Sequence, residues 1–228
     1  KRFSWEYTDI ITTPLLTMLI TGGITFGIIM PVSFYLFGIM NFAFESLNGS
    51  PIGSGILATL FLPSVMLGIH QGFVPVYEGL IKSIGMNTLF PVLAMAGAGQ
   101  VGASLALYVK ADKKSKLRAN IKGAIIPGLL GIGEPLIYGV TLPRVKPFFT
   151  SMLGGGVGGI YIGILAKMGY SFGLNTVFGS SGLLGAFAMT SKQGVGVAVA
   201  LYLSALCVAY IAGFVITYFF GTKDVDLS

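Results

Sequence analysis

Long uncharged stretches are the feature that most restricts how this chain can fold. Residues 10–44 contain no charged side chain, and several later runs are equally apolar. Only 10% of the 228 residues are charged, and 54% are hydrophobic. A soluble domain has roughly 25% charged residues, which it needs to cover its surface. The composition therefore excludes a soluble enzyme, a disordered tail and a nucleic-acid-binding module, and it predicts an all-α polytopic membrane protein.

Seven apolar runs divide the chain. A straight helix over 10–44 would be about 50 Å long, more than a hydrocarbon core of about 30 Å requires. We therefore expect a break or bend at Gly22-Gly23 or Pro31, or a helix that continues past the bilayer surface. The run at 172–189 is weaker and rich in Gly and Ser. The runs cover residues 10–44, 52–76, 89–109, 124–142, 148–166, 172–189 and 195–220.

Small residues inside one of these runs predict close helix contacts. Gly155, Gly159 and Gly163 recur every four residues and so share one helix face. Such stripes let helix backbones approach one another closely in lipid.

One short hydrophilic segment carries much of the positive charge. The segment 110–122 holds six of the 14 basic residues and one acid. Lys and Arg are retained on the cytoplasmic side during insertion, so we expect a cytoplasmic loop here. It is either a docking patch for a cytoplasmic partner or a loop that only sets the topology.

Glu134 is the most unusual residue of the chain. It lies in the sequence Gly-Ile-Gly-Glu-Pro at 131–135, inside an apolar run, where a charge costs on the order of 2.5–3.5 kcal/mol. Pro135 removes a backbone donor, and two glycines loosen the helix before it. Broken backbone at that depth is tolerated where it lines a cavity, so we expect a re-entrant hairpin with Glu134 at its tip. The carboxylate can accept hydrogen bonds from sugar hydroxyls or act as a general base. The alternatives are a surface loop residue or an ion pair with Arg144 or Lys146.

His70 lies in a second interrupted run, beside Gln71. Gly68, Gly72 and Pro75 disrupt regular helix around it. A neutral imidazole both donates and accepts a hydrogen bond, which suits a ligand rich in hydroxyls. The alternative is a buried histidine bonded to a backbone carbonyl.

Four further residues complete the candidate substrate site. Gln100 is an amide in an apolar, glycine-rich run, although a buried amide often only bonds adjacent backbone. Gly133 and Thr141 flank Glu134 in the same interrupted run. Arg144 can meet an anionic group or extend its side chain to the membrane interface. With one histidine and one cysteine in the chain, we expect no metal and no cofactor.

The two interrupted motifs carry a family resemblance. The sequence Gly-Ile-His-Gln-Gly-Phe-Val-Pro-Val at 68–76, paired with Gly-Ile-Gly-Glu-Pro-Leu-Ile-Tyr-Gly at 131–139, resembles the enzyme IIC permeases of the bacterial phosphoenolpyruvate-dependent sugar phosphotransferase system, glucose superfamily. The resemblance covers nearly the whole chain. It implies that residues 1–228 are the C-terminal, substrate-binding portion of a IIC domain. It further implies that the N-terminal scaffold helices and the IIB domain lie outside this chain.

The resemblance also implies a mechanism and partners. An extracellular sugar is bound, translocated and phosphorylated by a IIB domain that carries a phosphocysteine, with a IIA domain upstream. Glu134 and His70 match the family's two main sugar-contacting positions, and a homodimer in the bacterial inner membrane is implied. This makes the chain the membrane component of a protein-phosphocysteine–sugar phosphotransferase whose phosphoryl donor domain lies outside this chain.

Gly133 and the residues 136–144 look closest to the N-acetylmuramic acid branch, with the sucrose, trehalose and β-glucoside branches as neighbours. Two other classes remain open. In a proton-coupled transporter Glu134 would be the proton site, and the sugar would enter unmodified. A membrane sensor or scaffold would bind sugar without uptake.

Overall fold

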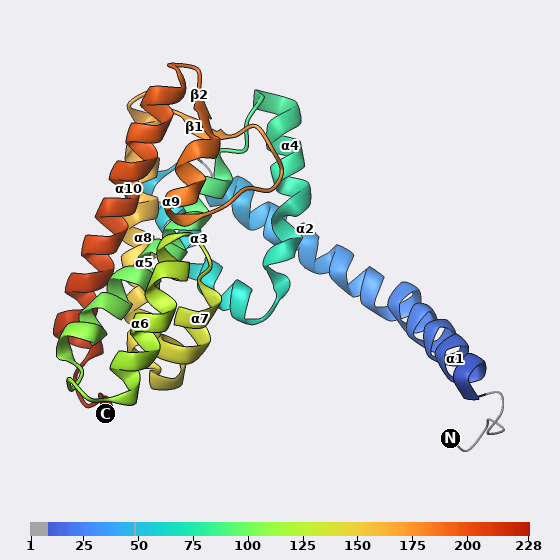
Figure 1. Ribbon diagram of the computed structural model, residues 1–228. Helices are drawn as coiled ribbons and strands as arrows, with labels where there is room; N and C mark the ends of the chain where they lie inside the picture. Colours follow the sequence, from blue (N-terminus) through green and yellow to red (C-terminus); the bar gives the residue numbers. More distant parts are fainter. Residues whose placement is uncertain (1–8, 48) are drawn as a thin grey trace. The chain divides into compact units, whose positions relative to one another are not determined.

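The computed structural model describes residues 9–47 and 49–228 and is almost entirely helical (Figure 1). The all-α prediction is confirmed, apart from one short antiparallel sheet. The elements are α1 Asp9–Ile24, the π-helix η1 Thr25–Ile29, α2 Met30–Leu47, α3 Pro51–Met66, the 3-10 helix η2 Ile69–Phe73, α4 Val74–Ile84, α5 Leu89–Lys110, α6 Lys116–Leu129, α7 Glu134–Leu136, the π-helix η3 Ile137–Thr141, the 3-10 helix η4 Leu142–Arg144, α8 Lys146–Lys167, β1 Phe172–Leu174, α9 Gly182–Gly185, the 3-10 helix η5 Ala186–Ala188, β2 Met189–Ser191, α10 Val195–Ile216 and the π-helix η6 Thr217–Gly221.

The chain forms two compact units, residues 1–43 and 44–228. In the first unit, α1, η1 and most of α2 follow one another as one helix, which continues through Gly22-Gly23 and past Pro31. The helix is therefore not broken at either position. The helix accommodates Pro31 with the π turn η1, because proline gives no N–H to the carbonyl of Gly27, which lies in that turn.

Four of the described helical stretches are long and apolar enough to cross a membrane. They are Ile11–Tyr35, Leu89–Lys110, Lys146–Lys167 and Val195–Gly221. The helix α3 is apolar but shorter. These stretches match the predicted runs at 89–109, 148–166 and 195–220, and they confirm a polytopic membrane protein.

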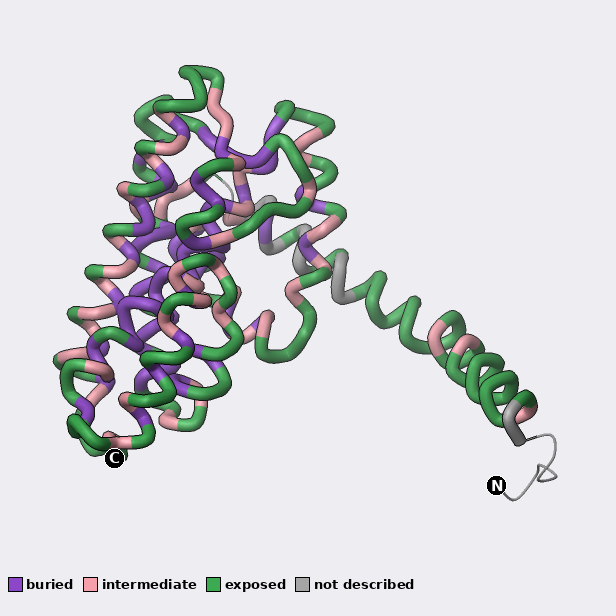
Figure 2. Tube along the Cα trace, in the orientation of Figure 1, coloured by how far each residue is buried: buried purple, intermediate pink, exposed green. Residues whose placement is uncertain are grey.

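The second unit is a helical bundle in which α8 contacts α3, α5 and α10. Figure 2 shows the buried residues concentrated where these helices meet. Glycines of α8 let the helices approach closely. A Cβ at Gly155 would lie 2.7 Å from the Cα of Ala96 on α5, and one at Gly159 would lie 2.5 Å from the carbonyl oxygen of Ser54 on α3. The predicted small-residue stripe is therefore confirmed as a packing surface.

Two helices are interrupted where the sequence predicts interruptions. After α3, Gly68 takes a left-handed φ of 74° and the chain enters η2. After α6, Gly131 takes a φ of 106° and the chain turns into α7, which contacts α6 (Figure 1). We call residues 116–144 the hairpin and residues 130–134 its tip. A Cβ at Gly128 of α6 would lie 2.3 Å from Leu136 of α7, so the two arms also meet at a glycine.

The run at 172–189 is not a helix along its length. It contains β1, a loop, α9 and η5 before β2 begins. Strand β1 pairs with β2 with Gly173 opposite Thr190, and Asn87 forms an isolated bridge to Leu174. The apolar residues of this run are partly buried in these short segments rather than in a membrane-spanning helix.

Most of the basic segment 110–122 is helical, whereas the sequence suggested a loop. Only residues 111–115 lie between α5 and α6, and Ser115 caps α6 by accepting a hydrogen bond from the N–H of Arg118 at 3.2 Å. The guanidinium of Arg118 lies 4.3 Å from the ring centre of Tyr108, and the Lys110 ammonium lies 4.1 Å from that of Tyr218. Two of the six cations therefore stabilise the ends of helices.

We expect Gly159→Ala to destabilise the protein by about 1–3 kcal/mol, because its methyl group would overlap the Ser54 carbonyl. The matched control is Gly123→Ala on α6, where nothing lies within 4 Å of the added Cβ. That control should be neutral or stabilising by up to about 1 kcal/mol, since alanine favours helix. Thermal unfolding in detergent measures both variants. Equal melting temperatures would contradict the packing role of the stripe.

Candidate functional site

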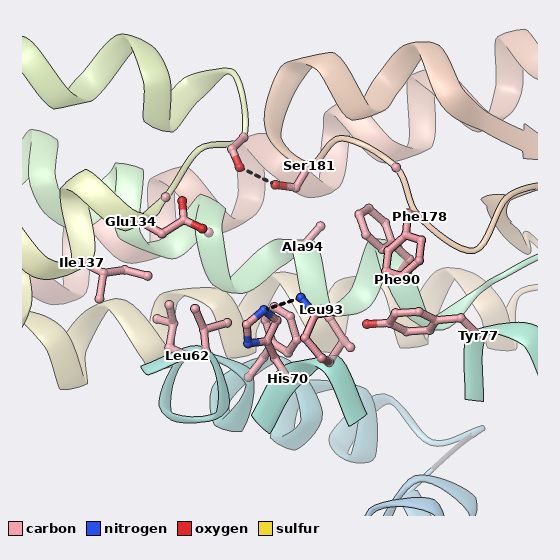
Figure 3. A pocket seen from close by; sticks show the side chains of 17 residues that line it. Leu62, His70, Tyr77, Phe90, Leu93, Ala94, Glu134, Ile137, Phe178 and Ser181 are labelled. Atoms are coloured by element: carbon pink, nitrogen blue, oxygen red, sulfur yellow. Dashed lines mark hydrogen bonds between the residues drawn. The ribbon is translucent and has the colours of Figure 1, made fainter. Parts of the chain in front are cut away.

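A cavity of about 280 Å³ lies in the second unit between the hairpin tip, α5, η2 and the loop that follows β1. Its volume is close to the lower end of the usual range for ligand sites, about 300–1,000 Å³. Figure 3 shows that Glu134 and His70 come from different elements and both line it. Gln71 and Gly133 line it as well. The structure therefore brings four of the seven candidate residues to one cavity.

Glu134 is placed at the cavity by the break before it. The left-handed Gly131 ends the first arm of the hairpin, and Glu134 is the first residue of α7. Pro135 follows in the first turn of α7, where a missing N–H breaks no helical hydrogen bond. The Glu134 side chain is exposed, and within residues 9–47 and 49–228 no hydrogen bond or ion pair engages its carboxylate. The alternative ion pair with Arg144 or Lys146 is not formed, and the carboxylate is available to a ligand.

His70 and Gln71 act as a pair. The Gln71 amide nitrogen lies 3.1 Å from Nε2 of His70. An amide nitrogen only donates, so Nε2 accepts and the ring proton resides on Nδ1. That Nδ1 atom is buried and has no hydrogen-bond partner in the described chain. The ring is held edge-on by Phe61, with centroids 6.2 Å apart and planes at 85°. The alternative of a histidine bonded to a backbone carbonyl is therefore not observed in the described residues.

Aromatic rings form another wall of the cavity. Tyr77, Phe90 and Phe178 line it (Figure 3). Tyr77 is buried, and its ring meets that of Phe90 at 6.2 Å and 73°. Flat apolar faces of this kind suit the C–H faces of a pyranose ring.

Sequence reasoning missed Phe90, Phe178 and Ser181. The latter two belong to the loop after β1, in the run that the sequence treated as one apolar stretch. Asn87 holds that loop: it is fully buried, bonds Leu174 through both backbone groups, and accepts from the N–H of Phe90 at 3.1 Å through its side chain. The available sequence signal was an asparagine just before the apolar run at 89–109, since side chains of this type usually cap helices.

Gln100 and Thr141 lie in the core next to the cavity rather than in its lining. Both are fully buried, and the Thr141 hydroxyl donates to the Gln100 carbonyl oxygen at 2.8 Å. This bond joins the second arm of the hairpin to α5. The Gln100 amide nitrogen has no partner in the described chain.

Arg144 is likewise outside the cavity lining. Its guanidinium donates to the backbone oxygens of Val140 and Asp226, both at 3.0 Å. The next residue, Val145, has a φ of 58°, which is strained for a β-branched side chain. Lys146 on its other side bonds Asp224 at 3.2 Å. The base of the hairpin is thus fastened to the C-terminal segment, and this arrangement does not bring Arg144 to a ligand in the cavity.

The fold defines a polytopic membrane protein, and its second unit contains a cavity lined by polar and aromatic side chains. A family model described as the phosphotransferase system EIIC matches residues 6–155, and the chain belongs to that family. The family resemblance seen in the two motifs is therefore confirmed.

Several curated relatives share more than half of their aligned residues with this chain. It is 61% identical to the "PTS system N-acetylmuramic acid-specific EIIBC component" of Pasteurella multocida over 228 residues, which are 100% of this chain and 48% of that protein. Identity to the proteins of the same name is 59% in Aliivibrio fischeri, over 100% of this chain and 47% of the relative, and 60% in Photorhabdus laumondii, over 96% and 44%. The chain spans about half the length of the curated relatives it matches. No solved structure matches it significantly.

Gly133 leaves room that a larger residue would occupy. A Cβ there would meet only Ile137, at 4.0 Å, and the φ of −83° suits any residue. We expect Gly133→Thr to fold normally but to crowd the cavity. Overpacking costs about 1–3 kcal/mol, so affinity for a ligand that fills the cavity should fall roughly 5- to 150-fold. Isothermal titration in detergent measures this change.

The matched control is Gly139→Thr in the same hairpin, at a glycine with open space that does not line the cavity. Its affinity for that ligand should equal that of the wild type. An unchanged affinity for Gly133→Thr would show that position 133 does not face the bound ligand.

Proposed function

We propose that this chain is the sugar-binding, membrane-spanning part of a phosphotransferase-system permease for N-acetylmuramic acid. The observation that carries the proposal is the unpaired Glu134 carboxylate facing a cavity that His70 shares. The names of the relatives support the choice of sugar. The permease binds the sugar from outside the bacterial inner membrane, carries it inward and presents it for phosphorylation.

The two polar groups have complementary roles. Glu134 accepts hydrogen bonds from sugar hydroxyls, and such charge-assisted bonds are about twice as strong as neutral ones. His70 and Gln71, joined through Nε2 of His70, form a polar pair that also lines the cavity. Tyr77 and Phe90 provide the apolar face. Gln100 and Thr141 keep the hairpin against α5, so that Glu134 stays at the cavity.

Phosphoryl transfer follows on the cytoplasmic side. The phosphorus–sulfur bond of the IIB phosphocysteine breaks, an oxygen–phosphorus bond forms at a sugar hydroxyl, and the cysteine leaves as a thiolate. Glu134 takes the proton of the attacking hydroxyl as general base. A IIA domain recharges IIB, and the complete permease acts as a homodimer.

The carboxylate of N-acetylmuramic acid restricts its orientation. None of the described residues that line the cavity is Lys or Arg. Two unit charges 4 Å apart repel by about 4 kcal/mol at an effective dielectric constant of 20, and by about half of that at 8 Å. The sugar carboxylate therefore points away from Glu134, towards the neutral donors of Gln71 and Tyr77.

We expect wild-type full-length protein to bind N-acetylmuramic acid in preference to sucrose or trehalose, and Glu134→Gln to bind it roughly 10- to 150-fold more weakly. That range corresponds to the loss of about 1.5–3 kcal/mol from a charged hydrogen-bond partner. Phosphorylation should fall further, by up to about 10²–10⁴-fold, if Glu134 is also the base. Competition titration and transfer from phospho-IIB measure the two effects.

The control is Glu78→Gln, which removes an exposed carboxylate of α4 whose partner is Lys82 at 3.8 Å. It should bind as the wild type does. Normal binding and phosphorylation by folded Glu134→Gln would remove Glu134 from the site. Tighter binding of sucrose or trehalose would overturn the choice of sugar, and proton-driven uptake without a phosphoryl donor would overturn the phosphotransferase role.

The basic segment 110–122 lies on the cytoplasmic side in this proposal. A cysteine at Ser115, introduced together with Cys207→Ala, should react with impermeant thiol reagents in inside-out vesicles and not in intact cells. Ser115 is half-buried between α5 and α6, so Lys114→Cys, an exposed neighbour, is the second probe. Labelling of either cysteine in intact cells would place the segment outside.

A further inference from the structure

The hairpin tip fits against a second turn from a distant part of the sequence. Gly131 and Gly182 both have left-handed backbone, with φ of 106° and 58°. A Cβ at Gly131 would lie 2.3 Å from the carbonyl oxygen of Ser181, and one at Gly182 would lie 2.6 Å from the backbone nitrogen of Gly131. The two turns therefore meet backbone to backbone, with no room for a side chain on either glycine.

One side chain joins the two turns. The Ser181 hydroxyl donates to the carbonyl oxygen of Gly131 at 2.9 Å. Within the described residues this is the hydrogen bond that ties the tip, residues 130–134, to another part of the fold. The tip's other hydrogen bonds within the described residues are local. The N–H groups of Leu130, Gly131 and Ile132 donate to carbonyls of α6, and the Gly133 carbonyl accepts from the two residues of the second arm that follow Pro135.

Ser181 makes this contact instead of capping its own helix, α9. It precedes α9 at the N-cap position, where a serine normally accepts a hydrogen bond from the first turn of its own helix. Here its side chain makes no such cap. Its extended backbone, with φ of −94° and ψ of −169°, instead directs the hydroxyl to the hairpin tip (Figure 3).

We propose that Ser181 is a positioning residue for Glu134. It anchors the carbonyl of Gly131 three residues before the carboxylate, and so sets where the sugar-binding oxygen atoms lie. The loop after β1 is therefore a template for the hairpin tip as well as part of the cavity wall. This inference rests on the proposed function of Glu134 as the sugar acceptor.

Ser181→Ala should weaken binding of N-acetylmuramic acid about 5-fold, which corresponds to about 1 kcal/mol for one hydrogen bond. Ser181→Thr keeps the hydroxyl on a backbone that suits threonine, and it should restore binding. The control is Ser204→Ala on α10, which removes a side-chain hydrogen bond from Tyr161 of α8 at 3.2 Å, away from the cavity. It should leave binding unchanged.

A double-mutant cycle separates positioning from direct contact. If Ser181 acts through Glu134, adding Ser181→Ala to Glu134→Gln should change affinity less than about 2-fold. The full 5-fold loss in that background would overturn the proposal, because Ser181 would then act on the sugar directly or on the fold as a whole.

A measurement without ligand keeps the inference apart from the choice of sugar. Hydrogen–deuterium exchange of amides at 131–134 should be about 5-fold faster in Ser181→Ala and normal in Ser181→Thr and Ser204→Ala. Unchanged exchange in Ser181→Ala would overturn the positioning role. Failure of the wild type to bind N-acetylmuramic acid, with the exchange result as expected, would instead overturn only the proposed function.

Discussion

The site depends on one constraint: where the hairpin turns, the backbone N–H and C=O groups that lose their helical partners must find other hydrogen bonds. Irregular backbone in apolar surroundings is stable only if its N–H and C=O groups find partners. The N–H groups of Gly131 and Ile132 bond carbonyls of α6, the Gly131 carbonyl accepts from Ser181, and the Gly133 carbonyl accepts from the N–H groups that follow. Because these groups are satisfied, the chain can reverse direction and present a carboxylate at a cavity.

The types of residue along the sequence are sufficient to predict the local features of the site, which are the two breaks in its helices. Glycines before a charged residue and a proline after it are sufficient to predict the break at Glu134, and similar signals predict the one near His70. The contact between Gly131 and Ser181 joins residues 50 positions apart, and hydropathy contains no information about it. The same limit explains why hydropathy predicts one apolar run at 172–189, although this segment folds into strands, a loop and short helices.

The sequence reveals which polar residues lie in apolar runs, but it does not reveal their hydrogen-bond partners. The sequence predicts that Gln100 and Thr141 bind the substrate, but the structure pairs them with each other in the core. The sequence offers Arg144 as a partner for an anionic group, but the guanidinium donates to backbone oxygens instead. In each case a protein acceptor at the right distance decides the outcome. On α5 the Gln100 amide nitrogen and the Ser104 hydroxyl have no partners in the described chain, at a cost of about 1–3 kcal/mol each.

Leaving Glu134 unpaired is consistent with a cavity that lacks a cation. A lysine or arginine beside it would form an ion pair, and a sugar would then have to compete for the carboxylate oxygens. An exposed carboxylate in an open cavity keeps its hydration and avoids the cost of 2.5–3.5 kcal/mol that a charge incurs inside the bilayer. When a ligand displaces that water, the hydrogen bonds that replace it form in a lower dielectric, in a cavity that the rings of Tyr77 and Phe90 also line, and become stronger. The apolar wall thus increases the energy of the polar contacts, and a ligand gains most when it offers hydroxyls to Glu134 and an apolar face to the rings at once.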